Sequence, residues 1–129
     1  MSKAKRSVIA KVKGSIVQGA KKATELGFPT INIVYDVAVQ LPQVGVYAGE
    51  LEFGGMKYPG AVCLGEGAGD AIPKLEIYCF DDVPIKHGDR ATIVFLKRLS
   101  DFVSGNDSSM KQKIANDVLA AVRFFGESR

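Results

Sequence analysis

The sequence of 129 residues has no tryptophan, one histidine and only two cysteines. Cys63 and Cys79 both lie inside apolar runs, and they have too few cysteine or histidine partners for a structural zinc site. We expect both to be small buried side chains in a reducing compartment. His87 lies in a predicted turn with no nucleophile–base partner in view, so we expect it at the surface.

Long apolar runs are also missing. No stretch approaches the roughly 20 apolar residues of a membrane span, and no signal peptide is visible. We therefore expect a cytoplasmic protein with no membrane partner. The net charge of +3 is mildly basic, with much of the excess in a tail at residues 1–6, and the aromatic residues are scattered. Stacking aromatics beside basic residues are typical of single-strand binders, so we expect no nucleic-acid partner. We also expect a monomer.

The length predicts one domain over residues 1–129, large enough to fold around one core. Short segments rich in β-branched and apolar residues alternate with glycine turns, which is typical of an antiparallel barrel or sandwich. Gly14 indicates a bulge or bend in the first segment, and the pair Gly54 and Gly55 predicts a hairpin turn. The predicted strands are residues 7–18, 31–35, 45–53, 57–64, 74–80 and 90–96.

The pattern changes after Ser100 and predicts a C-terminal helix over residues 108–125. We expect the helix to lie across the barrel with its apolar stripe as a packing face. That stripe comprises Met110, Ile114, Val118, Val122 and Phe125, and the predicted solvent side comprises Lys111, Gln112, Lys113, Asn116 and Arg123.

Residues 26–32, Leu-Gly-Phe-Pro-Thr-Ile-Asn, form a stiff turn that leads into a strand. Pro29 restricts the backbone, and the i, i+2 spacing puts Thr30 and Asn32 on one face of the strand. A hydroxyl and an amide oxygen side by side suit Mg²⁺ bound with a nucleotide phosphate. A loop-to-strand junction that satisfies its own backbone groups is the alternative.

Two further features bear on a phosphoryl-transfer site. Lys21 and Lys22 lie in a glycine-bounded loop, residues 19–27, which could follow a polyphosphate or could simply be a solvated charged loop. Glu76 lies in a mostly apolar strand. A desolvated carboxylate there would be suited to accept a proton, and an outward-facing glutamate on a barrel strand fits the alternation equally well.

Together these segments resemble the riboflavin kinases (flavokinases). Gly19 and residues 25–32 are similar to the family's glycine loop and Pro-Thr-Ala-Asn motif, and residues 75–78 to its Leu-Glu-Val-His strand. Residues 45–49 resemble its Gly-Val-Tyr strand, and residues 112–117 resemble the end of its helical tail. The resemblance runs in order from about residue 8 to residue 125. Further matches are residues 58–62 and 64–65.

The resemblance implies an all-β fold, a six-stranded antiparallel Greek-key β-barrel with a C-terminal helix. It also implies transfer of the γ-phosphate of ATP to the 5′-hydroxyl of riboflavin, giving FMN and ADP. Thr30 and Asn32 would hold Mg²⁺, and Glu76 would be the catalytic base. The nucleotide-binding residues would be Gly19, Lys21, Lys22, Ala23, Gly27, Pro29 and Thr30.

Several positions depart from the family pattern. Ala23 replaces a loop glycine, Ile31 an alanine and Ser100 an arginine, while residues 85–88 read Ile-Lys-His-Gly where the family tends to have Asp-Leu-Tyr-Gly. Together with the short loop at residues 65–73, the changes at 85–88 and Ser100 fall where flavin-binding segments are expected, so no flavin-contacting residue is assigned. A kinase of this fold with another acceptor or donor, or a non-catalytic flavin- or nucleotide-binding barrel, is the alternative. We expect no FMN adenylyltransferase domain in this chain.

Overall fold

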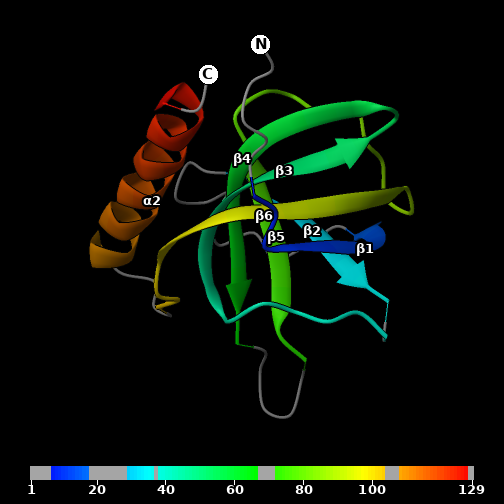
Figure 1. Ribbon diagram of the computed structural model, residues 1–129, viewed down its shortest axis with the longest axis horizontal. Coiled ribbons are helices and arrows are strands. Elements are labelled where there is room, and N and C mark those ends of the chain that lie inside the picture. The colour runs from blue at the N-terminus through cyan, green and yellow to red at the C-terminus, as the bar shows by residue number, and fades with distance from the viewer. Residues whose placement is uncertain (1–6, 18–28, 37, 67–71, 104–107, 128–129) are drawn as a thin grey trace.

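Six antiparallel strands close into a barrel in the computed structural model, which describes residues 7–17, 29–36, 38–66, 72–103 and 108–127. The strands are hydrogen-bonded in the order β1-β2-β5-β4-β3-β6, and β6 closes the barrel by pairing with β1 (Figure 1). Their bounds are β1 Ala10–Val17, β2 Ile31–Tyr35, β3 Gly45–Phe53, β4 Met56–Gly65, β5 Lys74–Cys79 and β6 Arg90–Ser100. The predicted barrel is thus confirmed, with β6 four residues longer than expected.

The connections follow a Greek key. Strands β3, β4 and β5 pair in succession, and β6 returns to lie beside β3, which gives the spatial order 6-3-4-5 of that motif. The tight turn between β3 and β4 is made by Gly54 and Gly55, at φ 60° and 80°. Both values are positive, as a two-residue turn that matches the twist of its strands requires, so the predicted hairpin is confirmed.

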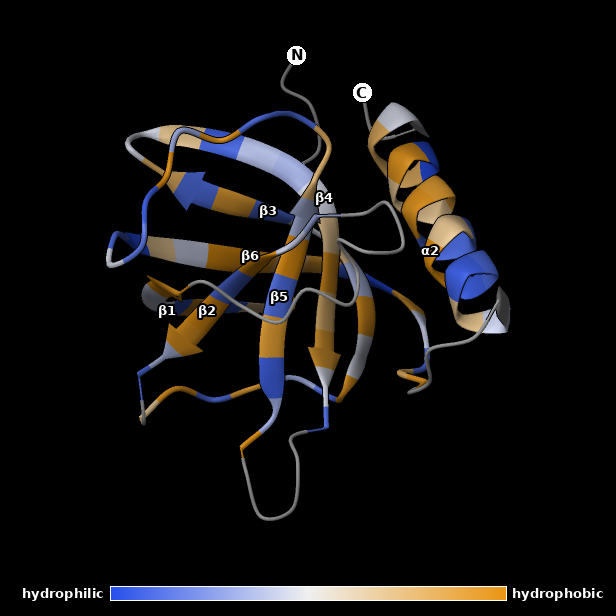
Figure 2. Ribbon diagram, turned by 180° about the vertical axis from the view of Figure 1, so that it is seen from behind, coloured by the Kyte–Doolittle hydropathy of each residue, from blue (hydrophilic) through white to orange (hydrophobic). Residues whose placement is uncertain are grey.

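Alternation along each strand fills the barrel with one set of apolar side chains. Tyr47 and Phe95 meet edge to face inside it, with ring centroids 5.0 Å apart. Alternating hydrophilic and hydrophobic bands along the first part of β5 are visible in Figure 2. The buried members are Val12, Ile16, Ile33, Tyr35, Tyr47, Leu51, Val62, Leu64, Leu75, Ile77, Ala91, Ile93 and Phe95.

Gly14 serves a different purpose from the bulge that the sequence predicts. The pairing of β1 with β6 runs through this residue, and the pairing of β1 with β2 begins at it, in both cases without a shift in register. A Cβ atom at Gly14 would lie 2.3 Å from the carbonyl oxygen of Val34, far inside contact distance. The glycine therefore permits close approach of β1 and β2. The register shifts of the barrel lie instead between β3 and β6.

The C-terminal helix, α2 (Ser108–Glu127), lies along one side of the barrel (Figure 1). Its buried Ala121 meets Ala48 of β3 and Ala61 of β4, and three small residues at one contact let the helix approach closely. Partly buried residues surround this contact, namely Phe80, Leu99, Val118, Phe124 and Phe125. The helix thus docks on the barrel as predicted, at its outer surface.

The face that α2 turns to the barrel differs from the predicted stripe at two positions. Val122 is 45% exposed, so its assignment to the packing face is wrong. Lys113, predicted to face solvent, instead donates hydrogen bonds to Ser100 Oγ at 3.0 Å and to Asp117 Oδ2 at 2.6 Å. Ser100 Oγ in turn donates to Asp117 Oδ1 at 2.7 Å. We call these three residues the helix clamp, because they join the end of β6 to α2.

Among the described residues, no helix is both long enough and apolar enough to cross a membrane.

Candidate functional site

Asn32 of β2 and Glu76 of β5 are direct partners across the β2–β5 pair. Their neighbours Ile33, Leu75 and Ile77 all belong to the barrel core. Because successive side chains of a strand point to opposite faces, Asn32 and Glu76 project from the outer surface of the barrel. The structure therefore brings the predicted metal ligand and the predicted base together on one face, although 43 residues separate them in the sequence.

Thr30 and Asn32 each carry a buried polar atom without a hydrogen-bond partner in the described part of the chain. These atoms are Thr30 Oγ1 and Asn32 Nδ2. Buried polar groups are almost always paired, and an unpaired one calls for a ligand, an ion or a water. The described residues contain no cluster of three or more histidine, cysteine, aspartate or glutamate side chains that could hold a metal ion. A cation here would thus rely on hydroxyl and amide oxygens, waters and the oxygens of its own ligand, which suits Mg²⁺.

The sequence left two alternatives for Glu76, a desolvated carboxylate or an outward-facing one, and the structure has features of both. It faces outward, as the alternation allowed, yet its side chain is only 19% exposed. Oε2 lies 3.7 Å from the ammonium nitrogen of Lys74, which precedes it by two residues on the same outer face. The carboxylate is thus largely sheltered from water. It is paired with a cation on its own strand, and Asn32 lies opposite it on β2.

Cys63 of β4 is the cross-strand neighbour of Glu76 on the side away from Asn32. Burial raises the pKa of the Cys63 thiol to about 12, and the negative charge of Glu76 adds to this shift while Lys113 opposes it. Burial likewise raises the pKa of Cys79 to about 12. Both cysteines are free thiols and are partly, not fully, buried. The thiol beside Glu76 is therefore neutral near pH 7.

Other predicted site residues are placed as follows. Pro29 is exposed and comes directly before Thr30. Gly19, Lys21, Lys22, Ala23 and Gly27 lie outside the described residues, so the nucleotide loop stays a prediction. His87 is exposed, as expected, in the turn before β6. Ser100, where the family has an arginine, belongs to the helix clamp.

Sequence reasoning missed two neighbours of Glu76. Lys74 could have been found, because its i, i+2 spacing from Glu76 puts both on one face of a strand. Cys63 could not, because its position depends on the pairing of β4 with β5.

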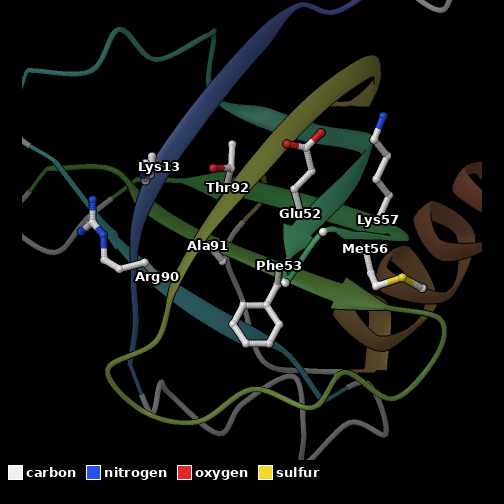
Figure 3. A pocket seen from close by; sticks show the side chains of 10 residues that line it. Lys13, Glu52, Phe53, Met56, Lys57, Arg90, Ala91 and Thr92 are labelled. Atoms are coloured by element: carbon white, nitrogen blue, oxygen red, sulfur yellow. The ribbon is translucent and has the colours of Figure 1, made fainter.

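A hollow of about 440 Å³ lies elsewhere on the barrel, beside the β3–β4 hairpin. Figure 3 shows Phe53 and Met56 of the hairpin and Arg90 at the start of β6 along its border. Arg90 donates hydrogen bonds to both carboxylate oxygens of Asp36, and this pairing lowers the pKa of the Asp36 carboxyl. None of the predicted site residues lines this hollow. The candidate site is instead the outer face around Asn32 and Glu76, which the pairing of β2 with β5 brings together.

The chain is similar to known proteins over most of its length. The family model described as Flavokinase, riboflavin kinase, matches residues 8–125. The bifunctional riboflavin kinase/FMN adenylyltransferase of Bacillus subtilis (strain 168) is 28% identical over 92% of the chain and 39% of its own length. The protein of the same description from Pseudomonas fluorescens is 31% identical over 86% of the chain and 37% of its own length. The chain thus spans about two fifths of these curated relatives.

Solved structures show the same fold at lower identity. A structure described as a macrolide-efflux protein from Streptococcus pneumoniae superposes with a TM-score of 0.75 at 21% identity, over 88% of this chain and 38% of that one. Riboflavin kinase from Trypanosoma brucei superposes with a TM-score of 0.61 at 22% identity, over 90% of this chain and 79% of that one.

Proposed function

The chain belongs to the riboflavin kinase family, and we propose that it transfers the γ-phosphate of ATP to the 5′-hydroxyl of riboflavin, giving FMN and ADP. The observation that carries the proposal is the pairing of Asn32 with Glu76 across β2 and β5. It supports a site in which phosphate-binding polar groups and a proton acceptor lie side by side. Phosphoryl transfer needs positioning and charge neutralisation more than covalent chemistry from the protein. A small number of protein groups therefore suffices.

Thr30 and Asn32 form the part of this site that would hold Mg²⁺. The unpaired Thr30 Oγ1 atom fits a cation or a phosphate oxygen, and the unpaired Asn32 Nδ2 atom is a donor that fits a phosphate oxygen. The cation itself would take the amide oxygen of Asn32, not Nδ2. Bound there, Mg²⁺ would neutralise charge on the phosphates of the nucleotide. The Thr30 hydroxyl and the Asn32 amide then orient the phosphate end of the donor on the outer face of the barrel. We place Gly19, Lys21, Lys22, Ala23, Gly27 and Pro29 along the rest of the nucleotide, as the family resemblance implies.

Glu76 is the general base of the proposal. A primary alcohol is a poor nucleophile near pH 7, and a carboxylate that accepts its proton as the new P–O bond forms assists the transfer. The sheltered position of Glu76 supports this role, because water competes less for a carboxylate that is only 19% exposed. The proton passes from the 5′-hydroxyl to Glu76, the alcohol oxygen bonds to phosphorus, and ADP leaves with the bridging oxygen.

The test is direct. The protein is incubated with riboflavin, Mg²⁺ and each nucleoside triphosphate in turn, and FMN is separated by chromatography. Formation of FMN that requires both Mg²⁺ and a triphosphate supports the proposal and identifies the donor. Flavin binding without turnover would replace it by a non-catalytic flavin-binding barrel.

The acceptor is the part of the proposal with a specific competitor. Residues 85–88 and Ser100 depart from the family pattern where flavin contacts are expected, and Ser100 is engaged in the helix clamp. A kinase that uses another small primary alcohol would leave riboflavin unchanged while still hydrolysing or transferring phosphate from the same donor. The cytoplasmic location and the monomeric state stay predictions of the sequence.

A further inference from the structure

Lys74 is the cation that the described residues bring within ion-pair distance of Glu76. Its Nζ atom lies 3.7 Å from Glu76 Oε2, and the side chains are 45% and 19% exposed. Both residues belong to β5 and share its outer face, with the core residue Leu75 between them. The spacing of the two residues is therefore fixed by the strand itself and does not depend on a loop.

This ion pair contributes little to the stability of the fold. Solvent screens a pair in which one partner is almost half exposed, and holding two long side chains in one arrangement costs conformational entropy. The pair matters more for the reaction rate, because it restrains the position of the carboxylate. An unrestrained glutamate on a barrel surface samples several rotamers, and a misplacement of a catalytic group by about 1 Å can cost roughly 100-fold in rate.

We propose that Lys74 is a positioning residue for Glu76, which holds Oε2 so that Oε1 is free to accept the proton of the acceptor hydroxyl. The proposal rests on the function proposed above, in which Glu76 is the base. Neither Asn32, Cys63 nor the helix clamp holds the carboxylate of Glu76 in position. Asn32 lies opposite Glu76, but its Nδ2 atom donates no hydrogen bond to the carboxylate, and the Cys63 thiol is neutral near pH 7. Lys113 and Asp117 of α2 act on the Cys63 thiol and are paired with each other in the helix clamp.

The experiment compares four proteins with the parent: Lys74→Met, Lys74→Arg, Glu76→Gln and the double variant Lys74→Met/Glu76→Gln. Lys57→Met is the matched control, since Lys57 is an exposed strand lysine opposite a glutamate, Glu52, away from the site. We expect Lys74→Met to lower kcat about tenfold, less than the 10²–10⁴-fold range typical of losing a general base. The KM values for riboflavin and nucleotide and the thermal midpoint should stay near those of the parent, and Lys74→Arg should recover most of the loss.

The double variant distinguishes positioning from an independent role. If Lys74 acts through Glu76, its replacement has no further effect once Glu76 is glutamine, and the double variant equals Glu76→Gln within about twofold. A further tenfold loss in the double variant would overturn the proposal, since Lys74 would then act without Glu76. A raised KM for the nucleotide with unchanged kcat in Lys74→Met would also overturn it, because Lys74 would then be a phosphate-binding residue.

Failure of this inference can be told apart from failure of the proposed function. If the parent makes FMN, Glu76→Gln loses activity and Lys74→Met does not, the positioning role is wrong and the kinase assignment stands. If the parent makes no FMN from any triphosphate, the function is wrong, and the positioning role, which rests on it, is overturned with it.

Discussion

The hydroxyl of Ser100 donates a 2.7 Å hydrogen bond to the carboxylate of Asp117, and through it the last residue of β6 is joined to helix α2. Lys113 contacts both residues, and the side chains of Lys113 and Asp117 are 23% and 13% exposed. The contact is polar, sheltered and complete, with a donor for each carboxylate oxygen. It explains why a lysine lies on the barrel side of this helix.

The first prediction concerns this helix clamp. Lys113→Met removes the cation and leaves the sheltered Asp117 carboxylate with Ser100 as its remaining partner in the clamp. We expect a loss of about 1–3 kcal/mol in the free energy of unfolding, the cost of leaving a buried polar group under-satisfied. Denaturant unfolding measures it, with Lys111→Met on the exposed side of α2 as the control. A loss for Lys113→Met no larger than that of the control would contradict the prediction.

The second prediction separates a catalyst from a binder. Glu76→Gln keeps the size of the side chain and can still hydrogen-bond a hydroxyl, but it cannot accept a proton. We expect kcat and kcat/KM to fall together by at least about 100-fold, the lower end of general-base magnitudes. Flavin fluorescence titration should show nearly unchanged binding. A kcat within about twofold of the parent, far short of general-base magnitudes, would mean that Glu76 is not the base.

The third prediction concerns the proposed metal pair. Asn32→Ala should reduce turnover by an amount equivalent to about 3 kcal/mol, the scale of losing one preorganised electrostatic contact. The fold should tolerate the change, because the Nδ2 atom of this buried residue has no partner to lose among the described residues. We expect the free energy of unfolding to stay within about 1 kcal/mol, since removal of an unsatisfied amide offsets the small void. Unimpaired turnover at limiting Mg²⁺ would remove Asn32 from the metal site.

The fourth prediction tests the close approach of β1 and β2. Gly14→Ala places a Cβ atom 2.3 Å from the Val34 carbonyl oxygen and 2.7 Å from the Tyr35 Cα atom. Backbone atoms cannot move aside as a side chain can, so we expect a loss of at least about 2 kcal/mol, within the range for overpacking. Gly126→Ala is the matched control. It has no atom within 4 Å of the new Cβ and should stabilise α2 by up to about 1 kcal/mol.

The fifth prediction follows from the two thiols. The pKa values of Cys63 and Cys79 are raised to about 12, so the reactive thiolate is scarce near neutral pH. Between pH 8 and pH 11 the rate of alkylation by iodoacetamide should rise about tenfold per pH unit, whereas an unfolded cysteine levels off near its ordinary pKa of about 8.5. Peptide mapping after timed alkylation measures each cysteine separately. A plateau near pH 9 in the folded protein would show that burial does not protect the thiols.

Much of the fold could be predicted because its signals are local. The alternation of β-branched residues and the paired glycines at Gly54 and Gly55 locate strands and a hairpin without any knowledge of the partners. Of the two roles predicted for Gly14, a bulge or a bend, the bulge is wrong, because the sequence does not show how closely a neighbouring strand approaches. The face of α2 was misjudged at Lys113 and Val122 for a similar reason, since the polar clamp and the alanine contact override the apolar stripe.

The candidate site was predictable in its members and not in its geometry. Thr30, Asn32 and Glu76 were found from residue type and spacing, and the family resemblance linked them. That Asn32 and Glu76 are cross-strand partners depends on the pairing of β2 with β5, which are not consecutive strands. The sequence alone leaves an outward-facing Glu76 as the alternative to a catalytic base. The structure shows Glu76 on the outer face, and the site that we propose lies on that face.

The alternation along β2 and β5 has a consequence for the use of activity as a measurement. On these strands Ile33, Leu75 and Ile77 face the core, while Asn32 and Glu76 face outward. A slip of one residue in strand register would exchange the two sets, with the polar residues inside and the aliphatic ones in water. Misregistered barrels would then retain strand content, as seen by circular dichroism, and have no working site. For the function that we propose, turnover per molecule would therefore fall with the fraction of misregistered chains, which spectroscopic measures of strand content do not detect.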